Sequence, residues 1–158
     1  MMFWGHHVPG AAIAVVCLLE AGLLDVVTEA VRRDFRIYLG GVWEDLARSA
    51  VPWLSFEGRR ALIASRWWGA AAGGPVELDI VAGFADGRGH LIGEAKLSIS
   101  ALEAERLLRD LRLRGERCPG IDGPLEPVLF VLDVPPELRE HPRIVGPEAV
   151  LVSRGTAS

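Results

Sequence analysis

The dipeptide Asp86-Gly87 constrains the fold more than any other feature of the sequence, because it separates two runs in which apolar and polar residues alternate. Asp-Gly is favoured in two-residue type I′ turns, which join antiparallel strands. A turn at these two residues makes the numbers of paired residues across the hairpin sum to 173. Asp79 is then predicted to lie opposite Glu94, and Glu77 opposite Lys96.

The predicted hairpin has one polar and one apolar face, because side chains alternate between the two faces of a strand. The polar face is expected to carry Glu77, Asp79, Glu94, Lys96 and Ser98. The apolar face is expected to carry Leu78, Ile80 and Ala82 on one strand, and Leu91, Gly93, Ala95 and Leu97 on the other.

The opposed acids Asp79 and Glu94 indicate a metal site. Carboxylates that face each other across a sheet repel and destabilise it. A divalent cation removes that conflict, since Mg²⁺ binds oxygen ligands from one or two carboxylates and keeps several waters. Lys96 can then hold the attacking water, whose pKa the metal lowers, which predicts metal-assisted hydrolysis of a phosphodiester. The alternative is a solvated charged face in which Glu77 and Lys96 form a salt bridge.

The rest of the chain predicts an α/β domain. A helical stripe of apolar residues covers 26–50, with Pro52 at its end, and a second helix at 100–114 begins with a capping box of Ser100 and Glu103. A strand, a crossover helix and a further strand in succession imply that the two strands are parallel and that the connection between them is right-handed. We therefore expect a mixed sheet flanked by helices. Its strands are predicted at 60–68, 76–82, 89–97, 127–134 and 149–152, with a short helix at 136–140.

Composition limits the class of protein. The 158 residues, half of them hydrophobic, are sufficient for one domain with a core. The net charge of −4 argues against a surface coated in positive charge, although it leaves room for a local basic groove. Residues 1–25 are expected to form an apolar segment of their own, 26–152 the domain, and 153–158 a tail. Glu20 and Asp25 interrupt the apolar segment before it reaches membrane-spanning length, so we expect a partner-facing helix and a cytoplasmic protein.

These motifs together resemble the PD-(D/E)XK, or restriction-endonuclease-like, superfamily. The similarity covers roughly residues 35–118 and is greatest to the nuclease-like C-terminal domain of archaeal-type P-loop ATPases. The motifs that carry it are Leu39-Gly40-Gly41-Val42-Trp43-Glu44-Asp45-Leu46-Ala47-Arg48, Arg66-Trp67-Trp68-Gly69, Glu77-Leu78-Asp79-Ile80-Val81-Ala82 and Gly93-Glu94-Ala95-Lys96.

The resemblance implies a three-layer restriction-endonuclease-like fold and a Mg²⁺- or Mn²⁺-dependent nuclease acting on DNA. It implies Asp79, Glu94 and the Ala95 carbonyl as metal ligands, Lys96 as the group that positions the water, and Glu44 as a further acid near the metal. Small residues next to Glu44 (Gly40, Gly41 and Ala47) would let its helix approach the sheet; a helix break at 40–41 is the alternative.

Other residues are assigned supporting roles. Glu77 matches the acid that precedes the family's aspartate, and Ser98 lies on the same predicted face as Lys96. Arg66, Trp67 and Trp68 could contact phosphates and stack on bases. The interpretation we favour for the two tryptophans is core packing at a strand end. The arginines of the 100–114 helix alternate with acids, which is typical of a solvated face.

The chain departs from the family in two ways. No GxxxxGK[ST] motif occurs in the sequence, so we expect a standalone copy or a truncated product in which residues 1–25 are the remnant of a joining region. Arg114 stands where the family often has a lysine, which keeps the charge but changes its geometry. Expected partners are DNA, a P-loop ATPase and a second copy of the chain. The competing hypothesis is a catalytically silent nuclease-fold module that binds a partner or regulates an ATPase system.

Overall fold

The computed structural model describes residues 16–17 and 20–155, and the chain divides into two compact units, Met1–Leu39 and Gly40–Ser158. The division falls within one continuous helix, α2 (Leu24–Ala50). The unit that carries the sheet therefore begins at Gly40, whereas the sequence suggested a domain over 26–152. Gly40 and Gly41 remain helical, so the helix break considered at this point is absent.

The part of α2 in the first unit has an exposed apolar stripe, which includes Val31, Phe35 and Tyr38. Much of the apolar N-terminal segment lies outside the described residues, in 1–15 and 18–19, so the prediction for 1–25 stays a prediction. No helix in the described part of the chain has the length and apolar character that a membrane crossing requires.

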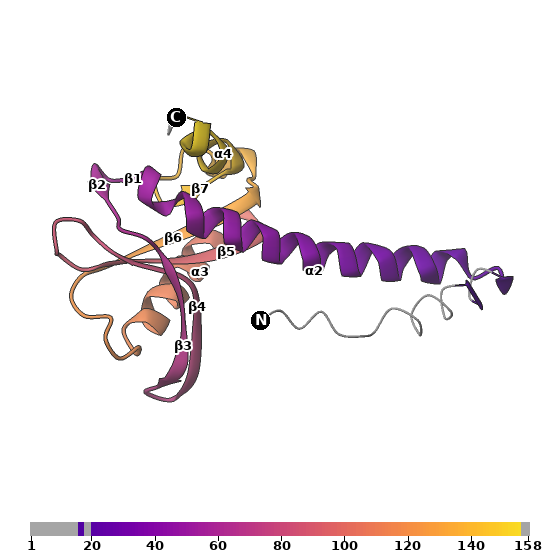
Figure 1. The fold of residues 1–158 in the computed structure, drawn as a ribbon, viewed down its shortest axis with the longest axis horizontal. Helices are drawn as coiled ribbons and strands as arrows, with labels where there is room; N and C mark the ends of the chain where they lie inside the picture. Colours follow the sequence, from indigo (N-terminus) through magenta and orange to yellow (C-terminus); the bar gives the residue numbers. More distant parts are fainter. Residues whose placement is uncertain (1–15, 18–19, 156–158) are drawn as a thin grey trace, which may run out of the picture. The chain divides into compact units, whose positions relative to one another are not determined.

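The second unit is built on a five-stranded sheet in the order β3-β4-β5-β6-β7 (Figure 1). The first three strands are antiparallel, and β5, β6 and β7 run parallel. Helix α3 (Ala101–Gly115) connects β5 to the parallel strand β6, and this is the crossover helix that the sequence predicted. The strands are β3 (Ser65–Ala71), β4 (Gly74–Gly83), β5 (His90–Ser98), β6 (Leu125–Asp133) and β7 (Ile144–Val145), and the helix is α3 (Ala101–Gly115).

Shorter elements complete the unit. A 3₁₀ turn, Val51–Trp53, and a two-stranded sheet of β1 (Ser55–Phe56) and β2 (Arg59–Arg60) follow α2. A second 3₁₀ turn, Pro136–Leu138, precedes β7. The chain ends in α4 (Pro147–Gly155).

The strand expected at 149–152 was wrong, because these residues lie in α4. Pro147 is the first residue of that helix and Glu148 lies in its first turn, two positions at which proline and an acid favour a helix start. A short apolar run such as Ala149–Val152 cannot by its periodicity distinguish a strand from a buried helix turn. The last strand of the sheet is instead β7.

Two hydrophobic clusters cover the two faces of the sheet, which confirms the three-layer α/β architecture. On one face α2 packs through Trp43, Ala47 and Ala50, and the Trp43 indole donates a hydrogen bond to the Phe130 carbonyl at 2.9 Å. The other face is covered by α3 through Ala104, Leu108 and Leu111, at helical spacing.

The predicted capping box is present at the start of α3. The Glu103 carboxylate accepts hydrogen bonds from the Ser100 N–H at 3.0 Å and from its hydroxyl at 2.7 Å. These bonds fix the point at which the chain leaves β5 and enters the crossover helix.

The register of β4 against β5 is the predicted one from Ile80–Gly93 to Gly83–His90, where the numbers of each pair sum to 173. The ladder ends there, so the predicted pairs Asp79–Glu94 and Glu77–Lys96 are not formed. The turn also differs from the prediction. Among the described non-glycine residues only Glu57 has a positive φ, so Asp86 cannot adopt the type I′ conformation. The loop is wider instead: the Gly87 N–H bonds to the Phe84 carbonyl at 3.0 Å, and the Asp86 carboxylate is held by Arg59.

A β-bulge in β4 changes the faces that the sequence predicted. Ser65 pairs with Val81 and Trp67 with Leu78, so one residue of β3 lies opposite two residues of β4, Asp79 and Ile80. Ile80 and Ala82 pack on the α2 side as part of the apolar face. Leu78, beyond the bulge, packs on the α3 side instead, which corrects its predicted face.

Substitution of Gly93 tests how closely β4 and β5 pack at the point where their ladder ends. A Cβ at this position would lie 2.9 Å from Ile80 Cβ and 3.1 Å from Phe130 Cε2. We expect Gly93→Ala to lower the free energy of unfolding by about 1–3 kcal/mol, measured by urea denaturation. The control is Gly41→Ala, whose Cβ meets no atom within 4 Å and should stabilise the helix by up to about 1 kcal/mol. Equal effects of the two changes would contradict this packing.

Candidate functional site

Asp79 lies in the bulge, where the antiparallel ladder between β4 and β5 stops. The last pair of the ladder is Ile80–Gly93. Beyond it the Asp79 carboxylate, through Oδ2, accepts the N–H of Ala95 at 3.0 Å. A side chain thus takes the place that a backbone carbonyl would occupy in a regular ladder, and the two strands separate here. The amide and carbonyl of one strand residue point to the same edge, so the Ala95 carbonyl also faces this opening.

The Glu94 side chain is largely enclosed, with 12% of its surface exposed. It shares a face of β5 with Ile92, which packs on the α3 side. Lys96 Nζ lies 2.6 Å from its Oε1, and Arg114 from α3 bonds to its Oε2. Burial opposes ionisation, but the Lys96 hydrogen bond and the charges of Arg114 and Lys96 outweigh it and lower the Glu94 pKa below the ordinary value.

Glu44 approaches the sheet from α2, on the face opposite to Glu94. It forms a close ion pair with Arg66 of β3, and Arg48 Nη2 lies 3.9 Å from its Oε2. Arg48 also donates from Nε to the Asp79 carbonyl at 3.0 Å, which links α2 to the bulge. The charge of Glu44, more than that of Glu77 or Asp79, raises the pKa of Arg66.

The glycines beside Glu44 do not bring its helix close to the sheet. A Cβ added at Gly40 or Gly41 would meet no atom within 4 Å. The close approach comes instead from Ala47 and Ala50, both fully buried on the side of α2 that faces the sheet.

The prediction of one polar patch was wrong for Glu77. Val76 and Leu78 both pack on the α3 side, so Glu77 between them points to the α2 side, where its Oε1 lies 3.7 Å from Arg66 Nη1. The salt bridge considered between Glu77 and Lys96 is therefore not formed. Both errors come from the bulge, because one extra residue reverses the faces on its far side.

The two neighbouring tryptophans have different environments. Trp67 is half-buried and packs against the α3-side cluster, as the core-packing interpretation expected. Trp68 points to the other face and is 78% exposed, so core packing was wrong for this residue. Successive side chains of a strand point to opposite faces, so two neighbouring tryptophans do not enter the same core. Ser98 lies at the exposed end of β5, on the same face as Glu94 and Lys96 by strand alternation.

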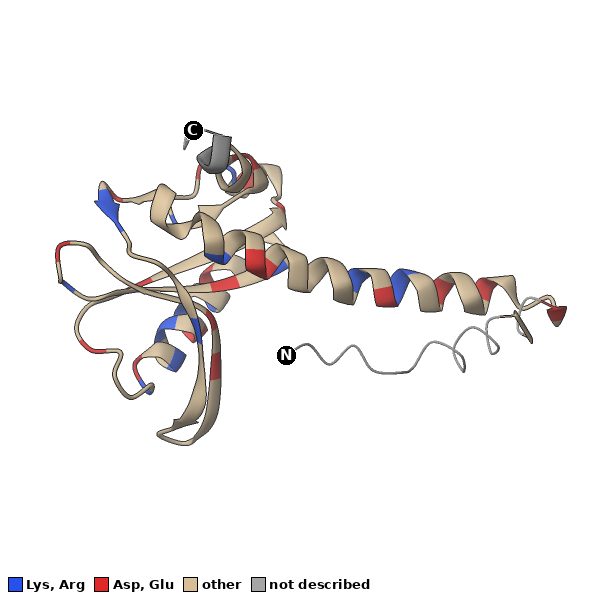
Figure 2. Ribbon diagram, in the orientation of Figure 1, with Lys and Arg blue, Asp and Glu red and all other residues tan. Residues whose placement is uncertain are grey.

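Arg48 and Arg114 contact the site although sequence reasoning gave neither a role in it. Arg114 was grouped with a solvated helix face, and Arg106 does pair there with Glu103 and Asp110. Arg114 instead follows Leu111 by one turn, which places it at the border of the buried face. This position, one helical turn after a buried leucine, was the feature of the sequence that could have assigned Arg114 to the site. Acidic and basic residues are interspersed along the described chain, as Figure 2 shows.

Asp79, Glu94 and the Ala95 carbonyl carry oxygen atoms, the type of donor that hard divalent cations bind. No three described His, Cys, Asp or Glu side chains are already placed to hold a metal together. Mg²⁺ does not require three, since one or two carboxylates, a carbonyl and waters suffice. Asp79, Glu94 and the Ala95 carbonyl supply such donors at the strand opening. Arg48 Nη2 is buried without a hydrogen-bond partner in the described chain, 3.9 Å from Glu44 Oε2; as a donor it cannot ligate a cation.

One comparison with known proteins gives a match. The model of a family described as archaeal and bacterial proteins of unknown function, DUF234, matches residues 14–107. This match covers more than half of the chain, and the chain belongs to that family. No curated protein and no solved structure matches it.

The lowered pKa of Glu94 predicts a specific pH dependence of stability. A carboxyl group whose folded pKa is depressed stabilises the fold above its unfolded pKa of about 4.3, and this contribution is lost as the pH falls through the folded pKa. We expect Glu94→Gln to cost about 1–2 kcal/mol at pH 7, since Lys96 and Arg114 are partly solvated. At pH 3 the two proteins should differ much less in urea denaturation.

The exposed Glu140→Gln is the matched control and should change neither value. A loss of stability in Glu94→Gln that is the same at pH 7 and pH 3 would show that the ion pairs of Glu94 are not its cause.

Proposed function

We propose that this member of the DUF234 family is a metal-dependent nuclease-like hydrolase of the PD-(D/E)XK type, which cleaves phosphodiester bonds, most readily those of DNA. The observation that carries the proposal is the hydrogen bond from the Ala95 N–H to the Asp79 carboxylate. It sets Asp79 beside the segment Glu94-Ala95-Lys96, at the one point where β4 and β5 separate.

Each residue has a role in this proposal. Asp79, Glu94 and the Ala95 carbonyl would hold Mg²⁺ or Mn²⁺, and Lys96, which now pairs with Glu94, would orient the attacking water. The bound cation would supply positive charge next to the phosphate and favour deprotonation of that water. Glu44 and Glu77 hold Arg66 in place on the other face.

Lys96 provides compositional support. It is the only lysine among the 17 Lys and Arg residues of the chain. Every other basic position is arginine, whose planar fork suits bidentate contacts. A lysine presents a compact ammonium that can hydrogen-bond a water from several directions, and this chain uses it only between Glu94 and the strand opening.

Charge balance supports an anionic substrate. The bases Arg48, Arg66, Lys96 and Arg114 offset all but one of the negative charges of the acids around them, which are Glu44, Asp45, Glu77, Asp79 and Glu94. A bound divalent cation would make the net charge of this region positive, which favours a phosphate group. The negative charge of the whole chain is therefore no obstacle to local binding of nucleic acid.

A catalytically silent module is the second candidate, and one observation favours it. Arg66 neutralises Glu44, and Lys96 and Arg114 neutralise Glu94, so the acids are satisfied by the chain itself. Such a module would keep the fold to bind a partner, either an ATPase or a second copy. Metal binding distinguishes the two candidates, because the silent module has no use for the cation.

Metal binding is predicted to raise the melting temperature. If Ca²⁺ or Mn²⁺ is present at about ten times its Kd, we expect an increase of about 3–5 °C. Asp79→Asn should abolish the increase while it keeps an oxygen that accepts the Ala95 N–H. Asp122→Asn, at an exposed position before β6, is the control and should respond as the wild type does. A wild type that shows no response to either cation would favour the silent module.

Cleavage is the direct test. Labelled single-stranded, duplex and branched DNA are incubated with the protein and Mg²⁺ or Mn²⁺, and the products are separated on a gel. Lys96→Ala should reduce the rate by about 10²-fold or more, and Lys96→Arg should not restore it fully. Arg109→Ala removes an exposed positive charge from α3 and should leave the rate unchanged. Cleavage that survives in Lys96→Ala would argue against the assigned role.

A further inference from the structure

We propose that the hollow beside Trp68 is a platform for one unpaired nucleobase, so that the preferred substrate of the site has a single-stranded stretch next to the scissile phosphate. The inference rests on the proposed function. It names the part of the nucleic acid that this surface would contact.

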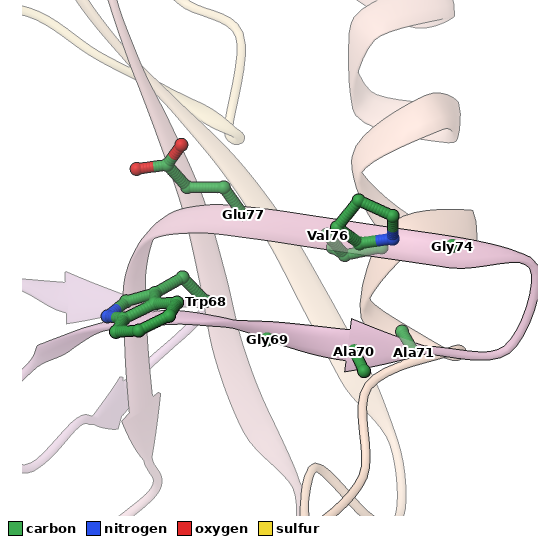
Figure 3. A pocket seen from close by; sticks show the side chains of 8 residues that line it. Trp68, Gly69, Ala70, Ala71, Gly74, Val76 and Glu77 are labelled. Carbon is green, nitrogen blue, oxygen red and sulfur yellow. The ribbon is translucent and has the colours of Figure 1, made fainter.

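The hollow lies on the β3–β4 hairpin and has a volume of about 640 Å³, within the range of small-molecule sites (Figure 3). Trp68 pairs with Glu77 and Ala70 with Pro75, so these four side chains share one face. The indole is 78% exposed. Beyond it the lining is small and apolar, with Ala70, Gly74 and Pro75 leaving space beside the ring.

The shape of this surface matches a flat aromatic ligand. An exposed tryptophan next to small residues offers a π-face on which any base can stack. The hairpin is also held in position, because Arg117 at the end of α3 donates a hydrogen bond to the Ala72 carbonyl at its tip. A platform that is fixed before binding loses little conformational entropy when a base stacks on it.

The charged side chains around the hollow indicate where the phosphate of the nucleotide would lie. Arg66 precedes Trp68 by two residues on the same face, which corresponds to about 6.6 Å along the strand. Arg66 also lies opposite the bulge residues Asp79 and Ile80. A base on Trp68 therefore has Arg66 on the side toward the strand opening, where its phosphate would lie. Arg66 pairs with Glu44 and Glu77 there, so it would turn from these carboxylates to the phosphate oxygen. Glu77, across from Trp68, disfavours a phosphate at the hollow itself.

Double-stranded nucleic acid does not fit this arrangement, because its bases are paired and stacked on each other. A single strand, an overhang or a frayed end can turn one base onto the indole. The hollow thus distinguishes the strandedness of the substrate, which the metal site alone does not.

The test measures binding without cleavage. A short fluorescein-labelled single strand is titrated with the protein in Ca²⁺ and followed by fluorescence anisotropy, in parallel with the duplex of the same sequence. Trp68→Ala should weaken single-strand binding by about tenfold or more, and Trp68→Phe, which keeps an aromatic face, should recover most of the affinity. The effect on the duplex should be small.

Trp53→Ala removes another exposed tryptophan from the described chain and is the matched control, with no expected change in affinity. Light scattering on each variant tests whether the hollow instead holds a second copy of the chain. The proposal is overturned if the wild type fails to bind the single strand, if Trp68→Ala binds it as tightly as the wild type, if the duplex loses as much affinity, or if Trp68→Ala changes self-association instead.

The outcomes separate this inference from the nuclease proposal. Metal-dependent cleavage by the wild type together with unchanged binding by Trp68→Ala would overturn only the base platform. Loss of strand binding in Trp68→Ala without cleavage by the wild type would overturn only the hydrolytic activity.

Discussion

The hydrogen bond between the Ala95 N–H and the Asp79 carboxylate is the contact on which the candidate site depends. A regular antiparallel ladder would continue past Ile80 and Gly93 and close the space between β4 and β5. The bulge prevents this, and it leaves a part-buried backbone donor, the Ala95 N–H, without a partner in the ladder. The Asp79 carboxylate accepts this N–H and is thereby held at a fixed position in the sheet. This bond, together with the one from Arg48 to the Asp79 carbonyl, keeps Asp79 next to Glu94 and Lys96.

The bulge also explains why β4 contributes to both cores. Leu78 packs under α3 and Ile80 under α2, so the strand changes faces over three residues. The consequence is a site with contributions from two sides of the sheet. Glu94 and Arg114 belong to the α3 side, whereas Glu44 and Arg66 belong to the α2 side. Only the strand opening is common to both, and it is where the proposed cation would lie, next to Asp79, Glu94 and the Ala95 carbonyl.

The register of β4 against β5 could be predicted from the sequence. The face of the sheet to which each side chain points beyond the bulge could not. The pairing of Ile80 with Gly93 followed from the position of Asp86-Gly87, even though the loop proved wider than a type I′ turn. Alternation then predicted the side chains correctly as far as Ile80. It failed at Leu78 and Glu77 because a bulge adds one residue without any apolar or turn signal in the sequence. Arg114 was missed for a related reason, since helical periodicity identifies the buried stripe and leaves residues at its border ambiguous.

The ion pairs at the site have a consequence for its chemistry. Lys96 and Arg114 stabilise the charged form of Glu94, and Arg66 occupies Glu44, so a cation must compete with basic side chains that are already in place. Such a site binds metal more weakly than an open cluster of acids would. The same bases are not lost when a cation enters, however, because an ammonium or guanidinium displaced from a carboxylate can turn to a phosphate oxygen. If the proposed function holds, the chain would bind the metal alone weakly and metal and phosphate together more tightly, and the two should bind cooperatively.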